Sequence, residues 1–157
     1  MQEYTGYRPN VAAIILSSDY DLTQHFVIAR RIGMRRGWQF PQGGIDAGET
    51  PREALLRELH EEIGTNDVEV LGEYPQWIQY DFPKKSSKKI YPFKGQRQRY
   101  FLVRLQPSAI VDLQLHTTPE FDAFRLVTWE ELFQRVTFFK RASYRRVIQY
   151  FRDKGQL

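Results

Sequence analysis

Three glutamates, Glu58, Glu61 and Glu62, follow a glycine-rich segment within one short stretch of the chain. Their spacings of three and four residues place all three carboxylates on one face of a helix. Like charges at these spacings repel, and each pair destabilises a bare helix by roughly 0.2–0.5 kcal/mol. A hard divalent cation such as Mg²⁺ or Mn²⁺ relieves this repulsion, because it takes anionic oxygen ligands and bridges them to substrate phosphates. The spacing therefore predicts a metal site for phosphate chemistry; the alternative is a solvated acidic helix.

Neighbouring residues have the types needed to support such a site. Arg57 lies eight residues after Glu49 and can pair with acids on its own helix, so we expect both residues to orient the carboxylates. Gly43 is expected to offer its backbone carbonyl as a further ligand, since Gly44 lets the chain approach closely. Glu58 is our hypothesis for the general base, but the sequence does not separate a base from a ligand.

The helix that carries the glutamates has clear start and stop signals. Thr50 is a typical N-cap, Pro51 occupies the first helical position, and Glu53 completes a capping box. Gly64 is expected to end the helix. Apolar residues recur with helical spacing between these ends, which predicts one buried face. This stripe comprises Ala54, Leu55, Leu59 and Ile63.

Apolar runs before and after this helix predict the strands of a sheet. Residues 11–16 form a continuous apolar run, as expected for a strand buried on both faces. Further strands are expected near residues 26–29, 68–74, 76–80, 100–105 and 124–129, and helices near 129–135 and 141–153. The segment 83–95 is expected to be a basic loop. This order predicts an α/β fold with a mixed sheet between helices.

The composition narrows the class of protein. A chain of 157 residues with 41% apolar residues fits one domain, here taken as residues 1–157. We find no apolar run long enough for a membrane span and no signal peptide, so a cytoplasmic protein is expected. The absence of cysteine excludes thiolate metal sites. The three histidines lack zinc-like spacing, so we expect none of them to be a ligand; these are His25, His60 and His116.

The net charge of +4 is unevenly distributed. Residues 84–99 carry seven basic residues and no acid, and residues 134–157 carry seven basic residues and one acid. Basic segments near an acidic metal site suit a polyanionic substrate whose reacting end is held by the cation. The alternative for any single lysine is a solubilising surface charge.

The glycine and glutamate pattern resembles the signature of the Nudix hydrolases, G-x5-E-x7-R-E-U-x-E-E-x-G-U, where U is apolar. The matching positions are Gly43, Glu49, Arg57, Glu58, Leu59, Glu61, Glu62 and Gly64. Thr65 departs from the pattern, which affects packing rather than chemistry. The resemblance implies a Nudix-type α/β/α sandwich, divalent-metal dependence and hydrolysis of phosphoanhydride bonds.

Weaker flanking motifs resemble one Nudix subgroup, which contains the bacterial RNA pyrophosphohydrolases and the dinucleoside polyphosphate hydrolases. These motifs lie at residues 7–11, 38–44, 118–121 and 139–141. The resemblance implies that Glu120 is a further metal ligand, that Arg8 and Arg30 lie near the phosphates, and that Phe139 and Lys140 lie along the nucleotide. The alternative for Phe139 is packing beneath the last helix together with its neighbour. Weaker candidates for phosphate contacts are Arg31, Arg35 and Arg36.

These observations lead to one expected function and two alternatives. The leading hypothesis is a pyrophosphohydrolase that removes diphosphate from the 5′ end of triphosphorylated RNA and leaves a 5′-monophosphate. The first alternative is cleavage of dinucleoside polyphosphates, such as diadenosine tetraphosphate, at the same site. The second is a non-catalytic RNA-binding module. The expected partner is the RNA 5′ end or the dinucleotide, with no membrane and no obligate protein partner.

Overall fold

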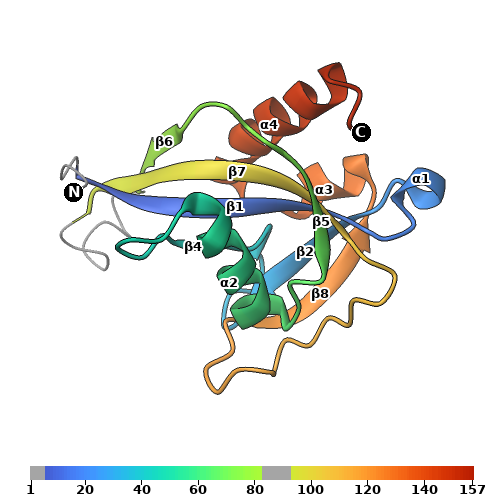
Figure 1. The fold of residues 1–157 in the computed structure, drawn as a ribbon, viewed down its shortest axis with the longest axis horizontal. Helices are drawn as coiled ribbons and strands as arrows, with labels where there is room; N and C mark the ends of the chain where they lie inside the picture. The colour runs from blue at the N-terminus through green and yellow to red at the C-terminus, as the bar shows by residue number, and fades with distance from the viewer. Residues whose placement is uncertain (1–5, 83–92) are drawn as a thin grey trace.

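The computed structural model describes residues 6–82 and 93–157, which build one eight-stranded mixed sheet flanked by helices (Figure 1). The strand order is β3-β2-β1-β7-β5, while β4 pairs with β1, β6 with β7 and β8 with β2. The strands are β1 Tyr7–Leu16, β2 Phe26–Arg31, β3 Trp38–Gln39, β4 Gln42–Gly44, β5 Val68–Glu73, β6 Ile78–Asp81, β7 Gly95–Leu105 and β8 Phe121–Val127. The helices are α1 Tyr20–Thr23, α2 Pro51–Ile63, α3 Trp129–Arg135, the 3₁₀ helix η1 Phe138–Lys140, and α4 Arg141–Asp153.

The central strands β1 and β7 run parallel, in register from Tyr7 opposite Gly95 to Leu16 opposite Arg104. The other strand pairs are antiparallel. Because successive side chains of a strand point to opposite faces, the apolar run of β1 contributes to two cores. Ala12 and Ile14 belong to the core that includes α4, whereas Ala13 and Ile15 pack with residues of α2. The prediction of a strand buried on both faces is confirmed.

Helices cover both faces of the sheet (Figure 1). On one face, Leu55 and Leu59 of α2 pack in the same cluster as Val103 of β7. On the other face, Val147 and Phe151 of α4 belong to the second core cluster. The sheet is therefore sandwiched between helical layers, which confirms the expected α/β/α architecture.

The glutamate-bearing helix α2 has the predicted ends. The Thr50 side chain accepts a hydrogen bond from the Glu53 backbone amide, and the Glu53 carboxylate accepts one from the Thr50 amide. Gly64 has a φ of 74°, a left-handed conformation that suits glycine, and its amide bonds the His60 carbonyl. The capping box fixes the start of α2, and hence the direction in which its glutamates project.

Several elements differ from the prediction at their ends. β1 begins at Tyr7 and β7 at Gly95, four and five residues earlier than the apolar runs indicated, because polar segments pair as well. Residues 20–23, for which the patterns above indicated no helix, form the short helix α1. The predicted basic loop mostly lies outside the described residues, since only residues 93–95 of it are described. Among the described residues, no helix is long and apolar enough to cross a membrane.

Candidate active site

An acidic cavity of about 240 Å³ lies between α2 and the segment 106–120, which connects β7 to β8. In Figure 1 this connecting segment lies below α2. The residues that line the cavity are Glu58, Glu61, Glu62, His116, Thr118 and Glu120. The structure thus brings the three helical glutamates together with Glu120, a carboxylate almost sixty residues further along the chain.

Two backbone contacts hold the connecting segment against the helix and the sheet. The Asp112 amide donates to the carbonyl of Ile63, the last residue of α2, at 2.8 Å. The Ile32 amide donates to the Glu120 carbonyl at 3.0 Å, directly before β8 begins. These bonds explain how a loop residue remote in sequence reaches the face of α2.

Glu62 is the most deeply buried acid of the cavity, with 4% of its surface exposed. Among the described residues, its Oε2 atom has no hydrogen-bond partner. Burial raises the pKa of Glu62 well above its usual value, and the neighbouring Glu120 carboxyl raises it further. A buried carboxylate oxygen without a donor costs free energy unless a cation or proton compensates it. Glu62 therefore has the properties expected of a cation ligand.

Glu58 lies against the backbone of β4. A Cβ atom built on Gly43 would overlap the Glu58 carboxyl group, so only glycine leaves room for that carboxyl. Burial raises the pKa of Glu58, while hydrogen bonding to Arg57 opposes the rise. The neighbouring Gly44 is covered by Arg8, whose guanidinium group would meet a Cβ there. The two glycines thus bring one carboxylate and one guanidinium against the same strand, β4.

Arg57 connects the acids to Gly44 of β4. Its Nε and Nη2 atoms donate to the two oxygens of Glu49 at 2.7 and 2.8 Å. Its Nη1 donates to Glu58 at 2.8 Å and to Glu61 at 3.2 Å, and Nη2 also donates to the Gly44 carbonyl at 2.8 Å. The bond to Arg57 lowers the pKa of Glu49 to about 2. The side chain is thus placed to orient two cavity carboxylates.

The donor set fits a hard divalent cation. Within residues 6–82 and 93–157, no group of three or more acidic, histidine or cysteine side chains is close enough together to hold a metal ion by itself. Mg²⁺ binds through one or two carboxylates and completes its shell with waters and substrate phosphates, so a partial protein set is sufficient. The unpartnered Glu62 oxygen and the all-oxygen donors agree with such an ion.

The residues expected to contact substrate lie outside the lining of the acidic cavity. Arg30 donates from Nε to Asp122 Oδ1 at 3.0 Å and lies 5.6 Å from the Trp38 ring centre. Phe139 is 46% exposed and packs 5.9 Å from the Tyr80 ring. The alternative, in which Phe139 and its neighbour Phe138 both pack beneath the last helix, is wrong for Phe138, because 80% of its surface is exposed.

Lys140 is buried, with 6% of its surface exposed. Its Nζ donates to the side-chain oxygens of Gln39 at 3.1 Å and Gln42 at 2.7 Å. Burial, with a smaller contribution from the charge of Arg31, lowers the pKa of Lys140 to about 7. The lysine therefore lies behind the surface, one residue from the exposed ring of Phe139.

Two features of the site were not predicted from the sequence. His116 lines the acidic cavity, and its Nε2 lies 3.5 Å from Nδ1 of His60, although no spacing pattern indicated a role. Buried amides also connect the strands beside Lys140: Gln98 donates to Gln42 at 2.9 Å, and Gln42 to Gln96 at 3.1 Å. The sequence did hold a signal for these amides, because Gln96 and Gln98 are two residues apart on β7 and therefore share one face of the strand.

The fold and the acidic cavity together define a class of protein. The NUDIX domain model matches residues 6–151, and the chain belongs to this family. The resemblance inferred from the glutamate spacing is therefore confirmed. The family consists of hydrolases that act on phosphoanhydride bonds and use divalent metal ions, and the chain is an enzyme of this kind.

Relatives match along the whole chain. An RNA pyrophosphohydrolase of Sulfurovum sp. (strain NBC37-1) is 58% identical over 155 residues, covering 99% of both chains. One of Helicobacter pylori (strain HPAG1) is 56% identical, covering 96% of this chain and 97% of the relative. One of Campylobacter jejuni (strain NCTC 11168) is 51% identical over the full length of both.

Solved structures share the fold at lower identity. The Escherichia coli dihydroneopterin triphosphate pyrophosphohydrolase matches with a TM-score of 0.73 and 16% identity, covering 92% of this chain and 96% of the other. A Caenorhabditis elegans Ap4A hydrolase binary complex matches with a TM-score of 0.66 and 17% identity, covering 92% and 98%. At these identities the likeness concerns the fold alone.

Proposed function

We propose that this chain removes diphosphate from the 5′ end of triphosphorylated RNA, using Mg²⁺ or Mn²⁺, and leaves a 5′-monophosphate. The observation that carries the proposal is the buried Glu62 carboxylate beside Glu120, in a chain similar to RNA pyrophosphohydrolases from end to end. A single domain spanning residues 1–157, a cytoplasmic location and the lack of an obligate protein partner stay predictions.

The acidic cavity would hold the cation through carboxylates from two elements. We assign this role to Glu58, Glu61, Glu62 and Glu120, together with the backbone carbonyl of Gly43. Arg57 and Glu49 would keep the helical carboxylates oriented, as their hydrogen bonds suggest. A bound divalent ion supplies Lewis-acid neutralisation of the charge on the phosphoryl oxygens.

In the proposed reaction, water adds to the α-phosphorus and the bond from that phosphorus to the α–β bridging oxygen breaks. Pyrophosphate leaves, and the proton of the water passes to a carboxylate. Glu58 is our assignment for this base, because its carboxyl group is fixed between Arg57 and Gly43. Positioning and charge stabilisation account for most of the catalysis of phosphoryl transfer.

Substrate contacts outside the cavity are assigned to four residues. Arg8, beside Gly44 of β4, would bind the phosphates with the forked donors of its guanidinium group. Arg30 would bind them after giving up its hydrogen bond to Asp122. Phe139 would stack on an unpaired base. Lys140, which is buried, would position the nucleotide indirectly through its hydrogen bond to Gln42.

Two other functions have weaker support. Dinucleoside polyphosphate cleavage uses the same chemistry, but the likeness to an Ap4A hydrolase structure concerns the fold alone. A non-catalytic RNA-binding module has no use for a buried carboxylate without a donor, which lowers the stability of the fold. We therefore rank triphosphorylated RNA first.

The test compares two substrates under the same conditions. Triphosphorylated RNA and diadenosine tetraphosphate are incubated separately with Mg²⁺ or Mn²⁺, and the products are separated by chromatography. We expect pyrophosphate and 5′-monophosphorylated RNA, and no reaction after chelation with EDTA. The RNA assignment fails if the RNA keeps its triphosphate while the dinucleotide is consumed.

A further inference from the structure

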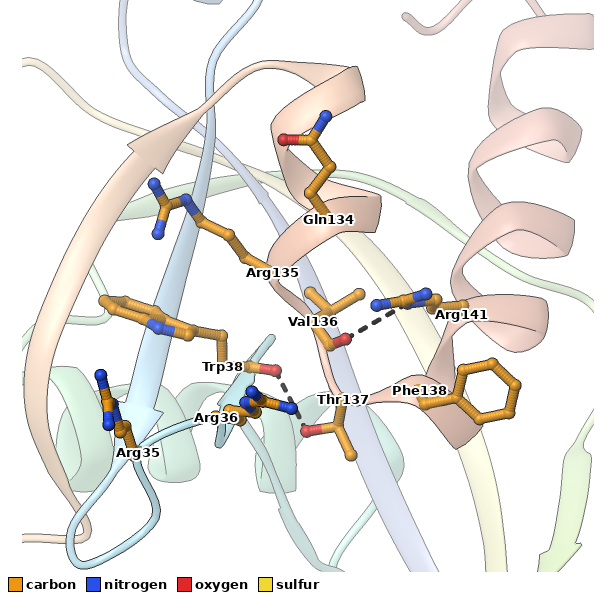
Figure 2. A pocket seen from close by; sticks show the side chains of 9 residues that line it. All are labelled: Arg35, Arg36, Trp38, Gln134, Arg135, Val136, Thr137, Phe138 and Arg141. Carbon is orange, nitrogen blue, oxygen red and sulfur yellow. Dashed lines mark hydrogen bonds between the residues drawn. The ribbon is translucent and has the colours of Figure 1, made fainter.

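A second and larger cavity lies beside the start of η1. It has a volume of about 580 Å³ and lies between the connection from β2 to β3 and the end of α3 (Figure 2). We call it the arginine cleft. Its lining residues are Arg35, Arg36, Trp38, Gln134, Arg135, Val136, Thr137, Phe138 and Arg141.

The lining of the arginine cleft carries four arginines and no acid. Over the described part of the chain, none of these arginines forms an ion pair with a carboxylate, in contrast to Arg57. The Arg141 side chain donates from Nε to the carbonyl of Val136 at 3.4 Å. Guanidinium groups are forked donors that match phosphate oxygens, and a cleft of one sign of charge concentrates counter-ions. The cleft therefore suits a ligand with several phosphates.

Aromatic rings lie among these arginines. Figure 2 shows Arg35 and Arg135 on opposite sides of the Trp38 indole, and Phe138 next to Arg141. The Arg141 guanidinium lies 5.5 Å from the Phe138 ring centre, and 80% of the Phe138 surface is exposed. Positive grooves with exposed aromatic rings are typical of single-stranded nucleic acid binding, since any base can stack on the ring.

The linings of the arginine cleft and the acidic cavity share no residue, but short stretches of chain connect the elements around them. Phe138 lines the cleft, and Lys140, two residues later on η1, bonds Gln42, the residue before Gly43. The Thr137 amide donates to the Trp38 carbonyl at 3.0 Å, which ties β3 to the start of η1. A strand of RNA whose first nucleotide lies beside Phe139 would therefore pass over η1 into the cleft.

We propose that the arginine cleft binds the sugar–phosphate backbone of single-stranded RNA downstream of the triphosphorylated nucleotide. The proposal rests on the proposed function, and it adds the part of the substrate that lies beyond the reacting phosphates. A dinucleoside polyphosphate ends at its second nucleoside and has no phosphodiester backbone to place there. The cleft thus favours RNA over the dinucleotide.

The test removes two cleft charges from exposed positions. The double variant Arg35→Gln/Arg36→Gln is compared with Arg52→Gln/Lys154→Gln, which removes two exposed charges elsewhere. Each is assayed with a triphosphorylated 12-nucleotide RNA, a triphosphorylated dinucleotide and diadenosine tetraphosphate. We expect the cleft variant to raise KM for the long RNA roughly tenfold at unchanged kcat, and to change KM for the two short substrates less than about twofold.

A salt series gives an independent measurement. For single strands the slope of log affinity against log salt is about −0.7 per phosphate contact, so losing two contacts reduces the slope by about 1.4. The binding of a fluorescent 12-nucleotide RNA, followed by anisotropy, reports this without turnover. Arg135→Gln, on a different element, should reduce the slope by about 0.7 and serves as the test if the double variant has a lowered Tm.

The outcomes separate the two proposals. If the wild type cleaves RNA and the cleft variants match the control with the long RNA, the cleft proposal is overturned and the function stands. If the cleft variants lose affinity for all three substrates equally, the cleft acts as a general anion site and the proposal is also wrong. If the wild type releases no pyrophosphate from either RNA, the proposed function fails first and the cleft proposal fails with it.

Discussion

The acidic cavity beside α2 and the arginine cleft around Trp38 hold their charges in different ways. In the acidic cavity, Glu58 and Glu62 are at least partly buried, and Arg57 bonds two of the carboxylates and the carbonyl of Gly44. In the cleft, within the described residues, none of the arginines forms an ion pair. One region has its geometry set by internal contacts, whereas the other presents free charges at the surface.

This difference suggests a division of labour between chemistry and binding. Catalytic groups have to be held in place before the substrate arrives, because their alignment supplies much of the rate enhancement. Arginines that hold a flexible polyanion need no fixed partner, because phosphates can satisfy them on binding. Substitutions in the cavity should therefore affect kcat, and substitutions in the cleft should affect KM.

The largest effect is expected for Glu62→Gln. The substitution removes the charge of a buried oxygen that has no described donor, so we expect kcat to fall at least about 10³-fold. The raised pKa shows that the ionised form is disfavoured in the fold, so the variant should have an unchanged or higher Tm. Pyrophosphate release and calorimetry check the two parts. A variant that keeps a tenth of the activity would contradict the assignment.

Replacement of the two adjacent glycines sharpens the comparison inside the cavity. Gly43→Ala places a methyl group on the Glu58 carboxyl, which Arg57 holds in place, so kcat should fall roughly 100-fold. Gly44→Ala meets only the flexible end of Arg8, and its effect should stay below about tenfold. Steady-state kinetics of both variants measure the two values of kcat. Equal losses would show that the Glu58 contact has no special importance.

A paired and an unpaired arginine should differ in their effect on stability. Arg57→Gln removes the guanidinium bonds to Glu49 and Glu58, and Glu49 keeps the bond from the Asp46 amide, so we expect the free energy of unfolding to fall by about 1–3 kcal/mol. Arg35→Gln breaks no ion pair and should change it by less than about 0.5 kcal/mol. Urea unfolding of both variants measures the difference. The contrast between the two regions breaks down if both values agree.

The last expected effect concerns how the stability of the fold depends on pH through Lys140. Its pKa of about 7 in the fold lies below the ordinary value near 10.4, so between these pH values the unfolded chain binds more protons. Raising the pH from 7 to 10 should therefore stabilise the wild type relative to Lys140→Met by roughly 2–4 kcal/mol. Urea unfolding at each pH gives the difference. Parallel curves would mean that folding does not lower the pKa of Lys140.

The bounds of α2 and the face that carries its glutamates were predicted from the sequence, because both depend on residues close together in the chain. Thr50, Pro51 and Gly64 act on neighbouring backbone groups, and the glutamate spacing follows from the helical repeat. The starts of β1 and β7 were missed because polar residues such as Arg8 and Gln96 become strand residues only by pairing with each other. The apolar runs that predicted these strands begin only after these positions.

The remaining parts of the site depend on contacts between distant segments. Glu120 was assigned by resemblance, and its place in the cavity depends on the bond between Ile32 and its carbonyl. The arginine cleft joins residues about one hundred positions apart, so Arg35 and Arg135 gave no common signal in the sequence. His116 entered the cavity through the same connecting segment as Glu120. Such placements require the folded topology.

The most direct test of the central claim is a titration of Mn²⁺ into the protein without substrate, followed by electron paramagnetic resonance. We expect saturable binding by the wild type and by Glu69→Gln, which changes an exposed glutamate outside the cavity, and at least about tenfold weaker binding by Glu62→Gln. Equal Mn²⁺ affinity in all three proteins would contradict the claim that the acidic cavity holds the catalytic cation.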